Sequence, residues 1–138
     1  MRTTRLLVLL AGGLLWAGSP AIAHHSFAAE FDSAQPATLS GTVTVMEWIN
    51  PHAWINLAVK KPDGKIENWE IETGNPSALI RRGFNRNSLP PGTEITVQGF
   101  RAKDGGMRAN GRDLTFKDGK KLFVGSSGTG APDERSEK

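Results

Sequence analysis

Residues 75–83, NPSALIRRG, carry the start and stop signals of a short helix. Asn75 is a good N-cap, and Pro76 suits the first helical position because its fixed φ already matches a helix. Gly83 suits the position just after the helix, where a positive φ is common, and two arginines precede it where the helix dipole favours cations. The sequence therefore predicts one short helix here.

Three stretches before this helix alternate apolar and polar residues, the period of two expected of half-buried strands. They are residues 37–49, 53–60 and 66–73. The positions predicted to face inward are Leu39, Val43, Val45, Ile49, Ala53, Ile55, Leu57, Val59, Trp69 and Ile71. The positions predicted to face outward are Thr42, Thr44, Met46, Trp48, His52, Trp54, Asn56, Ala58, Asn68, Glu70 and Glu72.

After the helix, a fourth strand with Ile95 and Val97 inward, a fifth over 107–116 and a small closing hairpin over 117–124 are expected. Three strands, a helix and two further strands form the element order of an OB-fold. We therefore predict an all-β, OB-fold-like, five-stranded Greek-key barrel with one short helix between strands 3 and 4. A small β-sandwich is the alternative.

The first 23 residues have the pattern of a secretory signal peptide. A basic start is followed by an apolar run from Leu6 to Trp16 and by small residues at a cleavage site after Ala23. This run is shorter than the roughly 20 residues of a spanning helix, although a retained anchor is the alternative. We expect a periplasmic protein with no stable membrane insertion.

The mature chain is divided into an N-terminal arm over 24–36, the barrel over 37–124 and a disordered tail over 125–138, which is rich in Gly, Ser and charge. The chain has no cysteine, so its core must hold it together without disulfides. Removal of Arg2 and Arg5 lowers the net charge from +3 to about +1. Nucleic acid is therefore not an expected partner.

An outward patch on the second and third strands is the first candidate site. An OB-fold binds ligands on this face, where aromatic rings can stack on sugars or apolar groups. The candidate ligand contacts are Trp48, His52, Trp54 and Glu70. They suggest a non-enzymatic module for an envelope ligand such as a glycan or peptide. The alternative is a patch covered by Phe27 and Phe31 of the N-terminal arm.

Copper is the second candidate ligand. Cleavage after Ala23 would make His24 the N-terminus, with its amine and imidazole beside the imidazole of His25. Such nitrogen-rich sets suit Cu(II) best among divalent first-row metals, and His52 could complete the metal set. The alternative is that His24 and His25 are polar spacers and that His52 is a turn residue.

Catalytic motifs are weak in this chain. It has no nucleophile elbow, zinc-protease motif, cysteine nucleophile or phosphate loop, so we assign no catalytic residue. Glu70 and Glu72 share a strand face at about 7 Å, a spacing that some hydrolases use, but such pairs are common on strands. The basic segment 81–112 suits either an anionic partner or a solvated face.

Several strings resemble a bacterial family of small exported proteins that is catalogued only as a domain of unknown function. They are HHSFAAEFD, NPHAW, NWEIETGNPSALIRRGF, LPPGTEITVQGFRAKDG and KLFVGSS, and together they span roughly residues 24–127. The matching positions are His24, His25, Ser26, Phe27, Asn50, Pro51, His52, Trp69, Glu70, Gly83 and Gly99. The resemblance implies secretion and an OB-like barrel, with no agreed activity.

Overall fold

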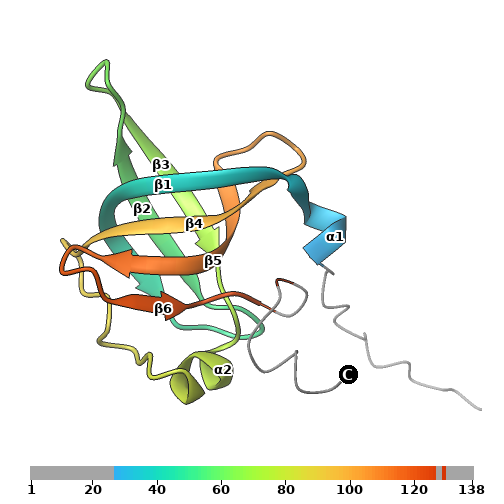
Figure 1. Ribbon diagram of the computed structural model, residues 1–138, viewed down its shortest axis with the longest axis vertical. Helices are drawn as coiled ribbons and strands as arrows, with labels where there is room; N and C mark the ends of the chain where they lie inside the picture. Colours follow the sequence, from blue (N-terminus) through green and yellow to red (C-terminus); the bar gives the residue numbers. More distant parts are fainter. Residues whose placement is uncertain (1–26, 127–128, 130–138) are drawn as a thin grey trace, which may run out of the picture.

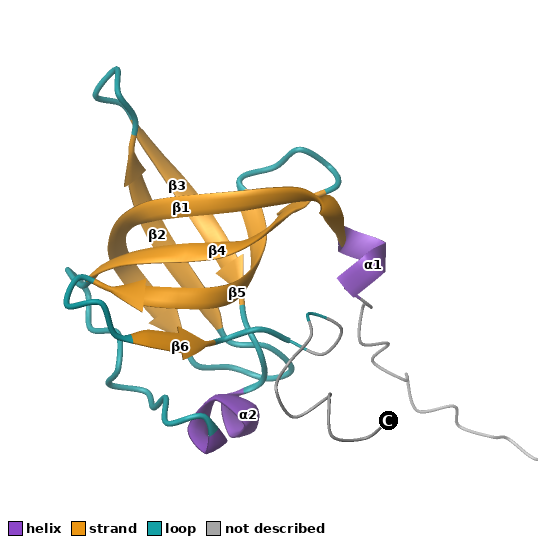
Figure 2. Cartoon of the chain, viewed as in Figure 1, coloured by secondary structure: helices purple, strands orange, loops and turns teal. Residues whose placement is uncertain are grey.

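The computed structural model describes residues 27–126 and residue 129, so the predicted leader, His24 and His25 lie outside the described residues. The elements are α1 (Phe27–Glu30), β1 (Phe31–Glu47), β2 (Trp54–Lys60), β3 (Ile66–Glu72), α2 (Pro76–Arg81), β4 (Glu94–Ala102), β5 (Arg108–Phe116) and β6 (Lys121–Phe123) (Figures 1 and 2). Neither helix in this part of the chain is long and apolar enough to cross a membrane.

Five strands close into a ring. The sheet order is β3-β2-β1-β4-β5-β6, and β3 also pairs with β5 in parallel, while the other neighbours are antiparallel. Because β1 is long and curved, its first part pairs with β4 and its last part pairs with β2 (Figure 1). The predicted OB-like strand order, with a helix between the third and fourth strands, is confirmed.

The core lies inside the ring, and α2 lies at one end of it (Figure 1). The Asn75 side chain accepts a hydrogen bond from the Ala78 N–H, and Gly83 has a φ of 84°, as the capping signals predict. Leu79 and Phe84 are buried from this side. The strands contribute most of the other large buried apolar side chains, among them Leu39, Val43, Ile55, Leu57, Trp69, Ile71, Ile95, Val97 and Leu114.

The predicted facing of β1 is correct up to Thr44, which is exposed as expected, and wrong from Val45 onward. Val43 pairs with Leu57 and Val45 pairs with Asn56, so one extra residue, Thr44, bulges out of the strand. A bulge of this kind reverses the alternation. Val45 is consequently about half exposed, and so is Ile49 further along the chain. Met46 and Trp48 turn inward and pack against the core, the reverse of the prediction.

The ordered structure extends on both sides of residues 37–124, the predicted bounds of the barrel. Residues 31–36, expected in a separate arm, belong to β1, and Phe31 is buried. Gly125, Ser126 and Thr129, expected in a disordered tail, are buried against the ring. Arginine side chains hold this segment, because Arg82 donates to the Gly125 carbonyl and Arg112 donates to the Thr129 carbonyl.

Candidate functional site

Two rows of outward side chains cross the sheet from β1 to β5. The register places Val45 opposite Asn56, Asn56 opposite Glu70, and Glu70 opposite Arg108. The neighbouring row runs through Glu47, Trp54, Glu72 and Asn110. Because β3 and β5 are parallel neighbours, the rows continue past β3 on the same face. This face carries two environments, one open and one buried.

The open part is a pocket of about 270 Å³, which we call the outer pocket. Its lining residues are Glu47, Ile49, Trp54, Asn56, Glu70 and Arg108. Trp54 and Glu70, two of the ligand contacts predicted from the sequence, therefore meet in one hollow. The bulge at Thr44 contributes here, since it turns Glu47 to the outer face.

The two carboxylates of the outer pocket differ in their contacts. Glu47 Oε1 accepts a hydrogen bond of 2.7 Å from the Asn56 side-chain amide. Glu70 is exposed, and its carboxylate has no hydrogen bond or ion pair within the described part of the chain. Glu70 is therefore the acidic group of the pocket that is available to a ligand.

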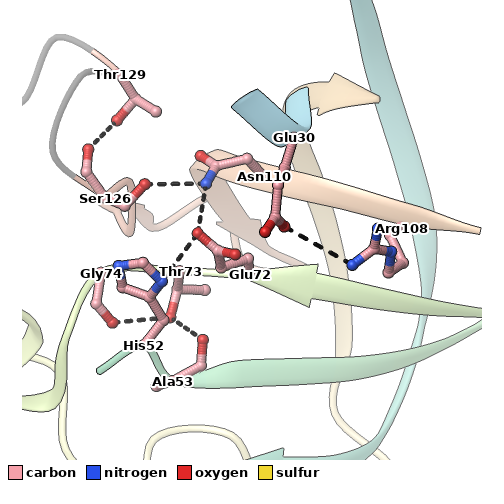
Figure 3. Close-up of polar contacts among 10 residues, drawn as sticks. All are labelled: Glu30, His52, Ala53, Glu72, Thr73, Gly74, Arg108, Asn110, Ser126 and Thr129. Carbon is pink, nitrogen blue, oxygen red and sulfur yellow. Dashed lines mark hydrogen bonds and ion pairs between the residues drawn. The ribbon is translucent and has the colours of Figure 1, made fainter. Parts of the chain in front are cut away.

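Arg108 is bound mainly to carboxylates outside the pocket. Its Nη2 lies 2.9 Å from Asp104 Oδ2, and its Nη1 lies 3.8 Å from Glu30 Oε2. Figure 3 shows this contact between Glu30, at the end of α1, and Arg108 at the start of β5. The pKa of Asp104 is lowered by hydrogen bonds from the Gly106 N–H and from Arg108. The guanidinium lines the pocket and is paired with carboxylates outside it.

The buried part consists of four polar side chains in contact, which we call the polar cluster (Figure 3): His52, Glu72, Asn110 and Ser126. Asn110 Nδ2 donates to Glu72 Oε1 at 3.2 Å and to Ser126 Oγ at 2.9 Å. Asn110 Oδ1 is buried, and it has no hydrogen-bond partner among the described residues. The cluster joins β3, β5 and the segment after β6.

Burial raises the pKa of Glu72 to about 7. Loss of water around the carboxylate is the main cause, and the negative charge of Glu30 adds to it. The hydrogen bond from Asn110 and the charge of Arg108 act in the opposite direction. Glu72 therefore changes its charge near neutral pH, in contact with His52.

His52 lies in the loop between β1 and β2, after the cis peptide bond Asn50–Pro51. Its Nδ1 is 3.1 Å from Glu72 Oε1, and its side chain is 21% exposed. When the carboxylate is ionised, Nδ1–H donates to it, and Nε2 then carries the lone pair of the ring. Glu72 thus orients the imidazole.

A larger hollow of about 430 Å³ lies elsewhere on the ring, over β1, β2, β4 and β5. Its charged groups are Lys60, Glu94 and Lys117, of which Glu94 and Lys117 pair with each other. It has no tryptophan in its lining. Size alone favours this hollow as a ligand site. It offers weaker contacts than the outer pocket does, because it lacks a tryptophan and two of its three charged groups are paired.

A family model of a family of unknown function matches residues 12–111, which is most of the chain and extends into β5. The chain belongs to the family DUF6152. This confirms the expectation of a family without an assigned activity. No curated protein and no solved structure matches the chain.

The predicted site residues of the DUF6152 chain that the structure describes lie in three different parts of the fold. Trp54 and Glu70 line the outer pocket, and His52 belongs to the polar cluster. Trp48 stacks on Phe84 with ring centroids 6.5 Å apart, so the structure places it at the core and away from the outer pocket. His24 and His25 lie outside the described residues.

The structure also bears on two alternatives raised from the sequence, the cover of the patch by Phe27 and the pairing of Glu70 with Glu72. Phe27 packs on Phe31 and Phe100, with centroids 5.9 and 5.5 Å apart, and does not line the outer pocket. Glu70 and Glu72 share a face, but one is exposed and the other buried. They occupy different environments, so they do not form a matched pair.

Sequence reasoning missed four residues of the outer pocket: Glu47, Ile49, Asn56 and Arg108. Ile49 was predicted to face inward. Asn56 was placed outward but was given no role. Arg108 lies at the pocket because β3 pairs with β5. Alternation within one strand does not predict which strands pair. Sequence reasoning also missed Asn110, because a polar residue buried outside the ring looks in the sequence like an ordinary outward position.

Proposed function

We propose that the protein is an exported, non-enzymatic binding module that holds its ligand in the outer pocket. The observation that carries this proposal is the meeting of Trp54 and Glu70 in one hollow with Glu47, Asn56 and Arg108. A tryptophan offers a large apolar surface, and the polar groups around it offer directional contacts. That combination is typical of a binding site.

The size of the outer pocket sets the kind of contact it can make. Small-molecule sites commonly enclose roughly 300–1,000 Å³, and the outer pocket is slightly smaller at about 270 Å³. It fits one side chain or one sugar ring. We propose that the ligand is a larger envelope molecule that inserts one group.

A chemical-shift titration of the purified protein against envelope glycans and peptides tests the proposal. We expect a ligand to shift the signals of the outer pocket, and Trp54→Ala to abolish the response without unfolding the protein. Ile66→Ala is the matched control, because Ile66 is 55% exposed at the start of β3 and does not line the pocket. No response across the panel, with Trp54→Ala harmless, would leave the pocket without a binding role.

We propose a Cu(II) site as a second candidate, because His52 has the setting of a metal-binding histidine. Metal-bound histidines usually donate their second ring nitrogen to a carboxylate or carbonyl, and His52 Nδ1 lies 3.1 Å from the buried Glu72. Within the described residues, no three histidine, cysteine or acidic side chains could hold a metal together. His24 and His25 would therefore have to supply the other nitrogens.

Metal analysis of the protein, purified from the envelope without an affinity tag, tests the copper proposal. Stoichiometric copper is expected, and its affinity should fall below about pH 6 as imidazoles gain protons. One residue added before His24 would remove the terminal amine from the metal set. If neither this extension nor His52→Ala changes Cu(II) affinity or its spectrum, the proposed site does not exist.

A further inference from the structure

Building on the proposed function, we propose that the outer pocket binds an organic cation, an alkylammonium or guanidinium group carried on a short apolar stem. Two carboxylates line the pocket, Glu47 from the end of β1 and Glu70 from β3. They lie on either side of β2, because β2 pairs with both β1 and β3. A cation above β2 would lie between them.

The positive charge of Arg108, which also lines the pocket, does not cancel these acids. Arg108 contacts Asp104 at 2.9 Å and Glu30 at 3.8 Å, so two carboxylates outside the pocket already balance its single charge. The Glu70 carboxylate has no such partner among the described residues. The pocket therefore keeps a negative charge, which favours a cationic group over an anionic one.

The apolar lining fits the stem of such a ligand. Trp54 is the aromatic side chain of the pocket, and a tryptophan ring attracts ammonium and guanidinium groups more strongly than other rings do. Ile49 is 49% exposed on the loop after β1, where it can cover methylene groups. The Asn56 amide holds Glu47 in place at 2.7 Å. A lysine or arginine side chain, or one end of a polyamine, satisfies all of these contacts.

The test is an NMR titration of the purified protein with matched probes. Nα-acetyl-lysine amide and Nα-acetyl-arginine amide carry the cation, and Nα-acetyl-norleucine amide is the neutral counterpart of the lysine probe. We expect the cationic probes to bind at least about tenfold more tightly than the neutral one, and more weakly as salt is raised. Spermidine and a lysine-containing tripeptide amide distinguish a free polyamine from a peptide as the source.

Two variants and one control assign the binding to the pocket. Glu70→Gln removes the unpartnered charge, and Trp54→Leu removes the ring but keeps an apolar side chain. Each should weaken cation binding by about tenfold while leaving the unfolding midpoint near that of the parent protein. Asp63→Asn removes one exposed charge in the β2–β3 turn, outside the pocket, and should change nothing.

Different results would contradict the cation proposal and the proposed binding function. If a neutral oligosaccharide shifts the Trp54 signals and the cationic probes do not, the cation proposal is overturned and the binding function stands. Equal affinity for the lysine and norleucine probes would also overturn it. If no probe and no glycan moves the pocket signals, both proposals fall.

Discussion

Glu72 was correctly placed on the outer face of β3 by sequence alternation, yet the same alternation predicted it to be exposed. It is buried because Asn110 lies beside it and because Ser126, from the Gly- and Ser-rich segment after β6, joins the cluster. Alternation identifies the face of a strand but not what covers that face. The buried carboxylate could therefore not be predicted from β3 alone.

The raised pKa of Glu72 makes stability depend on pH in a predictable direction. Its pKa rises from 4.5 to about 7 on folding, so the folded protein binds the proton more tightly. Its favourable contribution is complete below about pH 4.5 and is lost as the pH rises through about 7. Over this window, the parent protein should lose on the order of 2–3 kcal/mol relative to Glu72→Gln.

Urea unfolding of both proteins between pH 4 and 8 measures this difference. Glu70→Gln is the matched control, because Glu70 shares the strand and the face but is exposed. Parallel pH profiles for the parent and Glu72→Gln would contradict the assignment of Glu72 as the titrating group.

Asn110 should contribute to stability through its two hydrogen bonds. Asn110→Ala would leave Glu72 and Ser126 without their shared donor in a buried place. We expect a loss of about 1–3 kcal/mol in the free energy of unfolding, measured by urea denaturation. Asn68→Ala, at an exposed position on β3, should stay within about 0.5 kcal/mol of the parent. Similar losses in the two variants would rule out this role.

At the scale of elements, α2 was predictable because its signals are local. The Asn75 cap, Pro76 and the positive φ of Gly83 all lie within one short stretch. The bulge at Thr44 was not predictable, because it depends on how β1 pairs with β2. An alternating stretch contains no mark of the residue at which a neighbouring strand shifts its register.

The bulge assigns different roles to two tryptophans, and this difference is testable. Trp48 stacks on Phe84 and packs against the core, so Trp48→Ala should lower the free energy of unfolding by about 2–4 kcal/mol. Trp54 lines an open pocket, so Trp54→Ala should cost roughly 1 kcal/mol or less. Urea denaturation of both variants checks the contrast. The reverse order of losses would mean that β1 keeps its alternation past Val43.

At the scale of the whole molecule, the ring depends on pairings between strands far apart in the sequence. Element order predicted its topology, but the parallel β3–β5 contact brings Glu70 beside Arg108 and Glu72 beside Asn110. Gly99 permits close packing on β4, since a Cβ there would overlap the Asn110 carbonyl. Each candidate site thus combines β3 residues visible in the alternation with β5 residues that only the closed ring supplies.

The N-terminal sequence predicts export of the whole chain, and the fold does not test this prediction. We expect export and cleavage after Ala23, because a basic start, a short apolar run and a small-residue site follow one another in residues 1–23. The new N-terminus would be His24, three residues before α1. The described chain begins with α1, and Glu30 at the end of α1 contacts Arg108, which lines the outer pocket.

Intact-mass measurement of the protein recovered from the cell envelope checks this prediction. The expected species begins at His24, and it is the only form in which the amine of His24 can bind a metal. Ala23→Arg, which places a large charged residue at the cleavage site, should cause the uncleaved chain to accumulate. A protein that keeps residues 1–23 or stays in the cytoplasm would contradict the prediction. It would also remove the copper proposal, whereas the outer pocket, built from residues 47–108, would remain a candidate binding site.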